Sequence, residues 1–282
     1  MWVSRQGSPD NCPVDWEKLT PSEEIEAADW IAGRLHPFAQ DVGSVVPSGF
    51  EAYARIFHPA SRLVGTEQVE MRWSDVAEWS GRTVHPEMQF HTIAVPVPGR
   101  ETRLQAWSQE PWLGAPSQGQ LKALTGLLAR HTSNPDRCWF CVWEGYGSFH
   151  PNSRRELRAY SGSLRRIRYW WWRVRLRMPK PKPRVPTWKA VRLPQRDYIL
   201  FKGPLSLVLG QREGPNLWWP DDRSWCVASE IDFPYTYVGG SKRLIDEILA
   251  DPAIEALPAE LDHGITAFSD TVNAGGFEGF EE

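Results

Sequence analysis

The sequence predicts an α+β protein in which several helices pack on a single mixed or antiparallel sheet, with a basic insertion rich in Trp, Arg and Pro. Helical and strand-like segments follow one another without the regular strand–helix–strand rhythm of a doubly wound sheet, and no internal repeat is visible. The composition is that of a folded chain, because 41% of the residues are hydrophobic and 16 Trp supply large apolar surfaces to bury.

Four helices are expected, each from an N-cap residue followed by apolar residues three and four positions apart. They cover residues 20–35, 74–79, 117–131 and 241–249. The first rests on a capping box of Thr20 and Glu23. The third has the strongest pattern, because the capping box of Ser117 and Gln120 precedes a stripe of leucines.

Seven strands are expected where apolar and polar residues alternate, or where β-branched and aromatic residues cluster. They cover residues 50–58, 89–97, 137–143, 197–201, 205–209, 225–233 and 235–238. In the first strand, Ala54 and Ile56 share one face, while Tyr53, Arg55 and Phe57 share the other. A Gly-Gly turn is expected between the last strand and the helix that Ser241 caps.

The net charge of −3 conceals a strong asymmetry. Residues 154–192 contain 14 Arg and Lys and one acid, whereas the rest of the chain contains 18 basic and 34 acidic residues. We therefore expect an N-terminal arm over residues 1–19 and one α+β domain over 20–265. A basic insertion at about 148–192 interrupts this domain, and an acidic, Gly-rich, flexible tail follows over 266–282.

Several features favour the cytoplasm. The first ten residues contain no apolar stretch typical of a signal peptide, and no run of apolar residues approaches the length of about 18 that crosses a bilayer. The chain has only four Cys, far fewer than a disulfide-stabilised scaffold needs. No cofactor motif is present, so we expect no cofactor.

Cys138 and Cys141 have the spacing of a zinc or redox pair. Both lie within an expected strand, however, where residues three positions apart point to opposite faces. The interpretation as buried apolar residues is therefore preferred, and no metal site is expected.

The best carboxylate pair is Glu230 and Asp232. On one face of a strand over residues 225–233, their carboxylates would lie about 6.5–7 Å apart, which suits acid–base chemistry or a divalent ion. Glu144 is a third candidate if its strand is a neighbour. The alternative is a solvent-facing pair or one neutralised by Arg, so whether the protein is an enzyme stays open, with a non-catalytic role preferred.

The basic segment carries the candidate contacts to an anionic partner. Residues 164–178 fit either an amphipathic helix or a strand with Arg on one face. Arg interleaved with Trp is typical of surfaces that bind nucleic acid or anionic membranes. The preferred interpretation is that the segment docks on its own acidic domain or forms a solvated loop. The candidate residues are Arg165, Arg166, Arg168, Trp170, Trp171, Trp172, Arg173, Arg175 and Arg177.

Four segments, residues 49–55, 138–147, 216–220 and 225–233, resemble those of uncharacterised proteins from high-GC bacteria. That resemblance implies no activity, fold or site residue. The preferred hypothesis is therefore a cytoplasmic protein that binds another protein, as a regulator or a toxin-neutralising partner, because Trp and Arg are enriched at interface hot spots. The alternatives are an enzyme using Glu230 and Asp232, and a protein that contacts nucleic acid or a membrane surface through residues 154–192.

Overall fold

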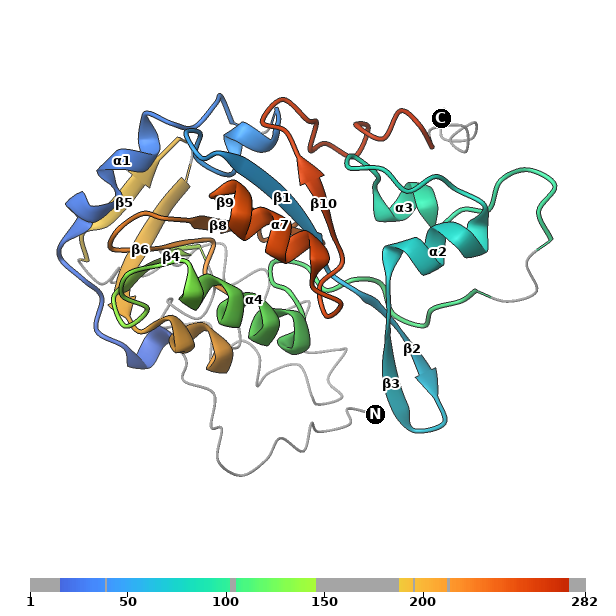
Figure 1. The fold of residues 1–282 in the computed structure, drawn as a ribbon, viewed down its shortest axis with the longest axis horizontal. Coiled ribbons are helices and arrows are strands. Elements are labelled where there is room, and N and C mark those ends of the chain that lie inside the picture. Colours follow the sequence, from blue (N-terminus) through green and yellow to red (C-terminus); the bar gives the residue numbers. More distant parts are fainter. Residues whose placement is uncertain are drawn as a thin grey trace, which may run out of the picture.

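An eight-stranded antiparallel sheet forms the centre of the computed structural model, which describes residues 16–38, 40–101, 105–145, 188–194, 196–211 and 214–273 (Figure 1). The strand order is β10-β1-β9-β8-β7-β4-β6-β5, and every neighbouring pair is antiparallel. The elements of the sheet are β1 (Ala52–Phe57), β4 (Cys138–Trp143), β5 (Ala190–Leu193), β6 (Arg196–Gly203), β7 (Leu217–Pro220), β8 (Cys226–Ser229), β9 (Tyr235–Gly240) and β10 (Ala256–Ala259). The expected α+β class is confirmed.

The remaining elements surround this sheet or extend from it. They are η1 (Trp16–Lys18), η2 (Ile25–Ala28), α1 (Asp29–Ala32), η3 (Val42–Ser44), β2 (Ala60–Val64), β3 (Glu67–Met71), α2 (Trp73–Ser80), α3 (Phe90–Ile93), α4 (Gln118–Arg130), η6 (Leu205–Gly210) and α7 (Lys242–Ala250). Among the described residues, no helix combines the length and the apolar character needed to cross a membrane.

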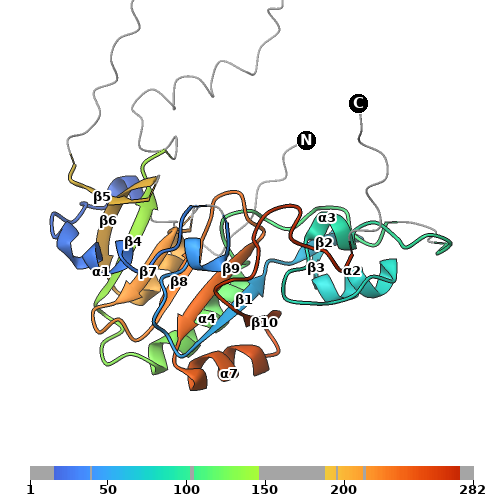
Figure 2. The same ribbon diagram turned by 90° about the horizontal axis from the view of Figure 1, so that it is seen from above.

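Helices α4 and α7 lie side by side on one face of the sheet (Figures 1 and 2). The capping box expected at α4 is present, with Ser117 and Gln120 each accepting a backbone hydrogen bond from the other at 3.3 Å. Ser241 caps α7 as expected, by accepting from Leu244 N at 3.2 Å. Apolar residues of both helices, including Leu124 and Leu128, pack against the sheet in one buried cluster.

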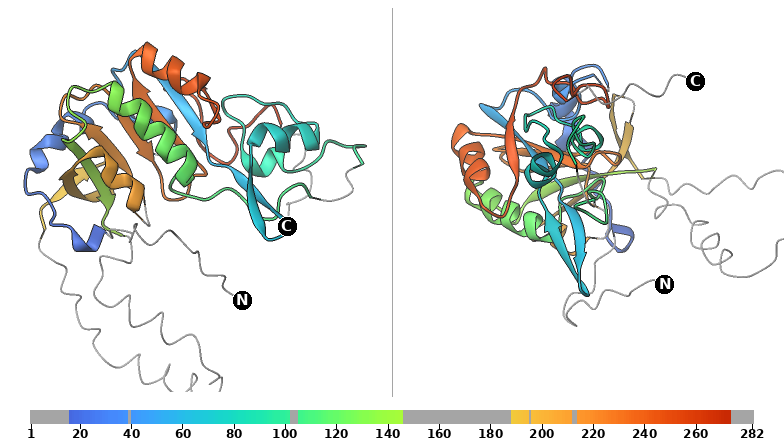
Figure 3. Two further views of the ribbon diagram at one scale, coloured as in Figure 1. Left: turned by 60° about the horizontal axis from the view of Figure 1, so that its bottom comes forward. Right: turned by 90° about the vertical axis from the view of Figure 1, so that its right-hand side faces the viewer.

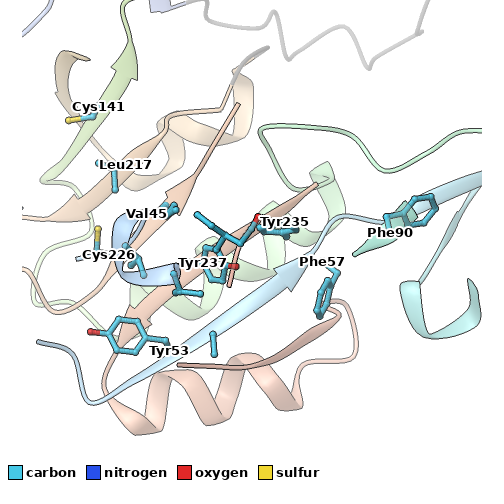
Figure 4. Close-up of a cluster of buried hydrophobic side chains, with 14 of the residues drawn as sticks. Val45, Tyr53, Phe57, Phe90, Cys141, Leu217, Cys226, Tyr235 and Tyr237 are labelled. Atoms are coloured by element: carbon cyan, nitrogen blue, oxygen red, sulfur yellow. Dashed lines mark hydrogen bonds between the residues drawn. The ribbon is translucent and has the colours of Figure 1, made fainter. Parts of the chain in front are cut away.

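The opposite face is covered by the N-terminal segment around η2, α1 and η3, and by α2 and α3 at the far end of β1. Neighbouring strands contribute residues to this face, as β4, β7 and β8 do with Cys141, Leu217 and Cys226 (Figure 4). On β1 the face assignment is confirmed, since Tyr53 and Phe57 belong to this cluster whereas Ala54 and Ile56 face the helices.

Hairpin β2–β3 extends β1 away from the sheet, next to α2 and α3 (Figure 3). Two carboxylates fasten this lobe to the rest of the protein. Glu255 accepts hydrogen bonds from Trp73 N at 2.6 Å and Ser74 N at 2.8 Å, at the start of α2. Asp270 accepts from His85 Nε2 at 2.7 Å and from the backbone at the start of α3.

Four expected elements are wrong. Residues 20–35 form only η2 and α1, and Thr20 caps no helix. Residues 89–97 contain the short helix α3, and residues 205–209 belong to the 3-10 helix η6. The strand expected over 225–233 ends at Ser229. At residues 89–97 and 205–209, a short apolar pattern fits a strand and a helix equally well, and tertiary packing decides between them.

The structure also places parts of the expected arm, insertion and tail in the packed protein. Trp16 is buried against Phe140 and Phe201. Residues 190–192 belong to β5 of the main sheet, and the tail residues up to Asn273 are held by Asp270. Gly239 and Gly240 continue β9, where they pair with β1, instead of forming a turn. A Cβ atom at either position would lie within 3 Å of a neighbouring side chain.

Candidate functional site

Glu230 and Asp232 do not lie on a strand. The ladder between β8 and β9 ends at the pair Ser229 and Thr236, and Glu230 begins a turn that the hydrogen bond from Phe233 N to Glu230 O closes at 3.1 Å. Asp232 lies in this turn and is exposed. The strand alternation that would bring the two carboxylates to one face is therefore absent.

Glu230 forms an ion pair with Arg196, which starts β6. Arg196 Nη2 lies 2.7 Å from Glu230 Oε2, and the two side chains are only 16% and 14% exposed. The guanidinium also lies over the rings of Trp143 and Phe38, at 5.4 Å and 5.5 Å from their centres. The pairing fits the alternative in which an Arg neutralises the carboxylate.

The pKa of the Glu230 carboxyl is raised above its ordinary value. Burial is the largest cause, and the charge of Asp232 adds to it, whereas Arg196 acts in the opposite direction. The ion pair anchors the turn after β8 to the start of β6.

Glu144 is exposed and follows β4, which β7 separates from β8. Glu144 was expected to join Glu230 and Asp232 only if β4 and β8 were neighbours, and they are not. Asn216 instead joins the ends of these strands, because its Oδ1 accepts from Trp143 N at 2.8 Å and its Nδ2 donates to Ser229 O at 3.1 Å. Sequence reasoning missed this buried amide, and no local pattern marks it.

The three described cysteines are buried and unpaired. Cys138 faces the helices and Cys141 the opposite side of the sheet, as the strand geometry predicts. Burial raises the pKa of Cys138 to about 12, with nearby Asp222, Asp221 and Asp136 adding to the effect, and burial also raises the pKa of Cys141. Within the described ranges, no three His, Cys, Asp or Glu side chains are grouped to hold a metal ion.

His58, which directly follows β1, is fully buried. Its Nδ1 donates to Trp112 O at 2.7 Å, so its Nε2 is unprotonated and accepts from Thr236 Oγ1 at 2.9 Å. Thr236 in turn contacts Ser229 Oγ at 2.7 Å. Burial lowers the pKa of His58 to about 4, which keeps the ring neutral. This chain of hydrogen bonds holds β8 and β9 to the loop at Trp112 and has no access to solvent at His58.

The basic candidates Arg165, Arg166, Arg168, Trp170, Trp171, Trp172, Arg173, Arg175 and Arg177 lie outside the described residues. The structure does describe where the chain re-enters the sheet, at Trp188 and β5.

A groove of about 580 Å³ lies at this edge of the sheet, between β5 and the segment that forms η2 and α1. Its walls combine apolar and charged residues, which are Ile25, Ala28, Asp29, Ala32, Trp188, Lys189, Ala190, Val191, Arg192 and Leu193. Trp188 is 41% exposed at one end. Sequence reasoning missed the groove, because it assigned residues 190–192 to the insertion and not to a strand.

On the outer edge of β5, the backbone groups of two residues have no hydrogen-bond partner among the described residues. Glu144 N donates to Asp197 O, so the backbone N–H and C=O groups of Asp197 point toward β4. Arg192 is the cross-strand partner of Asp197 on β5, and its own backbone groups therefore point away from β6. By the same alternation Ala190 is also turned outward. Among the described residues, no hydrogen bond involves these outward groups.

No family model, curated protein or solved structure matches the chain.

Proposed function

We propose that this is a cytoplasmic, non-catalytic protein that binds an extended, acidic segment of another protein at the edge of β5, as a regulator or a toxin-neutralising partner does. The observation that carries the proposal is the free edge of β5 beside the groove under α1. An extended segment that adds to a sheet edge gains main-chain hydrogen bonds, while alternate side chains fill adjacent pockets.

The backbone supports this mode of binding. Ala190 and Arg192 offer N–H and C=O groups on the outer edge, two residues apart, which is the repeat of an antiparallel ladder. A ninth strand would continue the sheet beyond β5.

The side chains of the groove favour apolar residues at alternate positions of the partner segment. Val191 and Leu193 lie on the face of the sheet that η2 and α1 cover. Ala28 and Ala32 leave space opposite them because their side chains are small. Side chains on one face of an added strand would therefore enter the groove.

The charge of this edge favours an acidic partner. Lys189, directly before β5, and Arg192 on β5 are exposed, and Asp29 lies across the groove. The chain that leads into β5 is also strongly basic, with 12 Arg and Lys between residues 154 and 184. Complementary charge raises the association rate and selects against basic partners.

Backbone amide exchange measured by NMR tests the proposal directly, with a short peptide of alternating Glu and Val as the probe. Exchange of the Ala190 and Arg192 amides should slow when the peptide is added. The amides of Val191 and Leu193, which already point toward β6, should change little. A peptide of alternating Lys and Val should bind roughly tenfold more weakly.

Two variants and one control complete the test. Arg192→Pro removes an outward N–H without removing a bond to β6, and Ala32→Trp fills the groove; both should abolish binding. Arg243→Glu, a charge change on the exposed surface of α7, should bind as the wild type does. Binding that survives Arg192→Pro, or slow exchange at Ala190 and Arg192 before any peptide is added, would contradict the proposal.

A further inference from the structure

The β2–β3 hairpin is exposed on both faces. All residues from 62 to 70 are exposed, including Leu63 at 63%, Val64 at 51% and Val69 at 39%. Two-stranded hairpins with both faces in water are marginally stable, and exposed edges that carry apolar side chains tend to pair with another strand. Figure 3 shows the hairpin projecting from the body in both views.

One edge of the hairpin is already covered. Ser61 exchanges two backbone hydrogen bonds with Gln109, both 3.0 Å long, and Leu63 N donates to Ser108 Oγ at 3.1 Å. The segment around residues 108–109 therefore covers the outer edge of β2. The opposite edge belongs to β3.

On the outer edge of β3, two residues have backbone groups without a hydrogen-bond partner in the described part of the chain. The backbone N–H and C=O groups of Ser61 point away from β3. Those of its cross-strand partner Glu70 therefore point away from β2. Gln68, two residues earlier, shares that direction. Within the described residues, the N–H and C=O groups of Gln68 and Glu70 have no partner.

We infer that two copies of this chain form a symmetric dimer in which β3 pairs antiparallel with β3 of the second copy, with the two-fold axis at Val69. In this register, Gln68 lies opposite Glu70 of the second copy. The outward backbone N–H and C=O groups of these two residues can therefore form hydrogen bonds with each other. No carboxylate lies directly opposite another carboxylate. The two Val69 side chains face each other at the axis, as a closely spaced cross-strand pair. This dimer is independent of binding at β5.

The surface at the base of β3 has room for the second hairpin. A hollow of about 260 Å³ lies there, with Glu70 and Arg72 among its walls. The register that centres on Val69 places Arg72 opposite Thr66 of the second copy, which is at the tip of its hairpin. The tip of each hairpin would therefore lie at the hollow of the other copy, as a self-complementary two-fold interface requires.

Sedimentation equilibrium of the full chain, at concentrations up to about 100 μM, tests the dimer. The wild type should be dimeric. Val69→Lys and Val69→Glu should each be monomeric, because like charges would face each other at the axis. An equimolar mixture of the two variants should restore the dimer, since opposite charges then meet.

Leu63→Lys is the matched control, because it introduces the same charge in the same hairpin on the strand away from the axis. It should remain dimeric, and cooperative unfolding of each variant should confirm that it is folded. A monomeric wild type, a dimeric Val69→Lys variant, a mixture that stays monomeric, or a Leu63→Lys variant that dissociates would each overturn the inference.

Discussion

The guanidinium of Arg196 holds the carboxylate of Glu230 across the end of the sheet, with 2.7 Å between Nη2 and Oε2. The contact joins the start of β6 to the turn after β8, two strands that β7 and β4 separate in the sheet. This ion pair therefore holds the turn that follows β8 in place. It also engages Glu230, which the sequence predicts as a catalytic candidate.

Loss of Arg196 should destabilise the protein more than loss of the whole pair. Arg196→Met leaves a largely buried carboxylate without its partner and should lower the free energy of unfolding by about 3 kcal/mol. The double variant Arg196→Met/Glu230→Gln should recover part of this loss. Urea unfolding of the two single variants and the double variant measures the coupling, and strictly additive effects would contradict it.

Divalent metal ions should not stabilise the protein through Glu230 and Asp232. Glu230 already pairs with Arg196, and Asp232 is exposed in a turn, so the two offer no preformed site. Thermal unfolding with and without Mg²⁺, Mn²⁺ or Zn²⁺ should give the same Tm. A rise in Tm that disappears in Glu230→Gln or Asp232→Asn would support the enzyme hypothesis instead.

His58 should make stability fall in mildly acidic solution. Its folded-state pKa of about 4 lies below the ordinary value of 6.5, so the unfolded chain binds a proton that the folded protein does not. The contribution of His58 to the free energy of unfolding is fully present above pH 6.5. It falls by about 1.4 kcal/mol per pH unit as the pH decreases toward 4.

The variant His58→Gln isolates this effect, because the amide can replace both hydrogen bonds but does not titrate. Urea unfolding of both proteins between pH 7.5 and pH 4.5 should give curves that converge as the pH falls. Parallel curves would contradict the prediction, because they would show that His58 takes up a proton as readily in the folded protein as in the unfolded chain.

The three described cysteines should resist alkylation in the folded protein. Burial raises the thiol pKa of Cys138, Cys141 and Cys226, so almost no thiolate is present near neutral pH. Residue-resolved mass spectrometry after treatment with iodoacetamide should find them modified only when urea unfolds the protein. Rapid labelling of Cys141 in native buffer would be inconsistent with its burial.

Elements whose signals are local could be predicted. The capping box of Ser117 with Gln120 and the N-cap Ser241 lie next to their apolar stripes, so α4 and α7 were identified with small errors at the ends. The alternation of β1 assigned Tyr53 and Ala54 to opposite faces, because the side-chain period of a strand is two.

Elements that depend on distant partners could not be predicted. The exposed hairpin β2–β3 has no buried face, so its sequence shows no alternation to detect. The edge strands β5 and β10 have four residues each and are strands only because β6 and β1 pair with them. Residues 89–97 formed a helix where a strand was expected, since packing overrides weak propensity.

By itself, the sequence determined the α+β class, the two capped helices on the sheet and the contrast between an acidic body and a basic segment, because composition and short-range periodicity encode these properties. Only the tertiary structure decided that Glu230 meets Arg196, and that one edge each of β3 and β5 pairs with no strand among the described residues. Which groups meet depends on strand order, and strand order results from packing between residues that lie far apart in the chain.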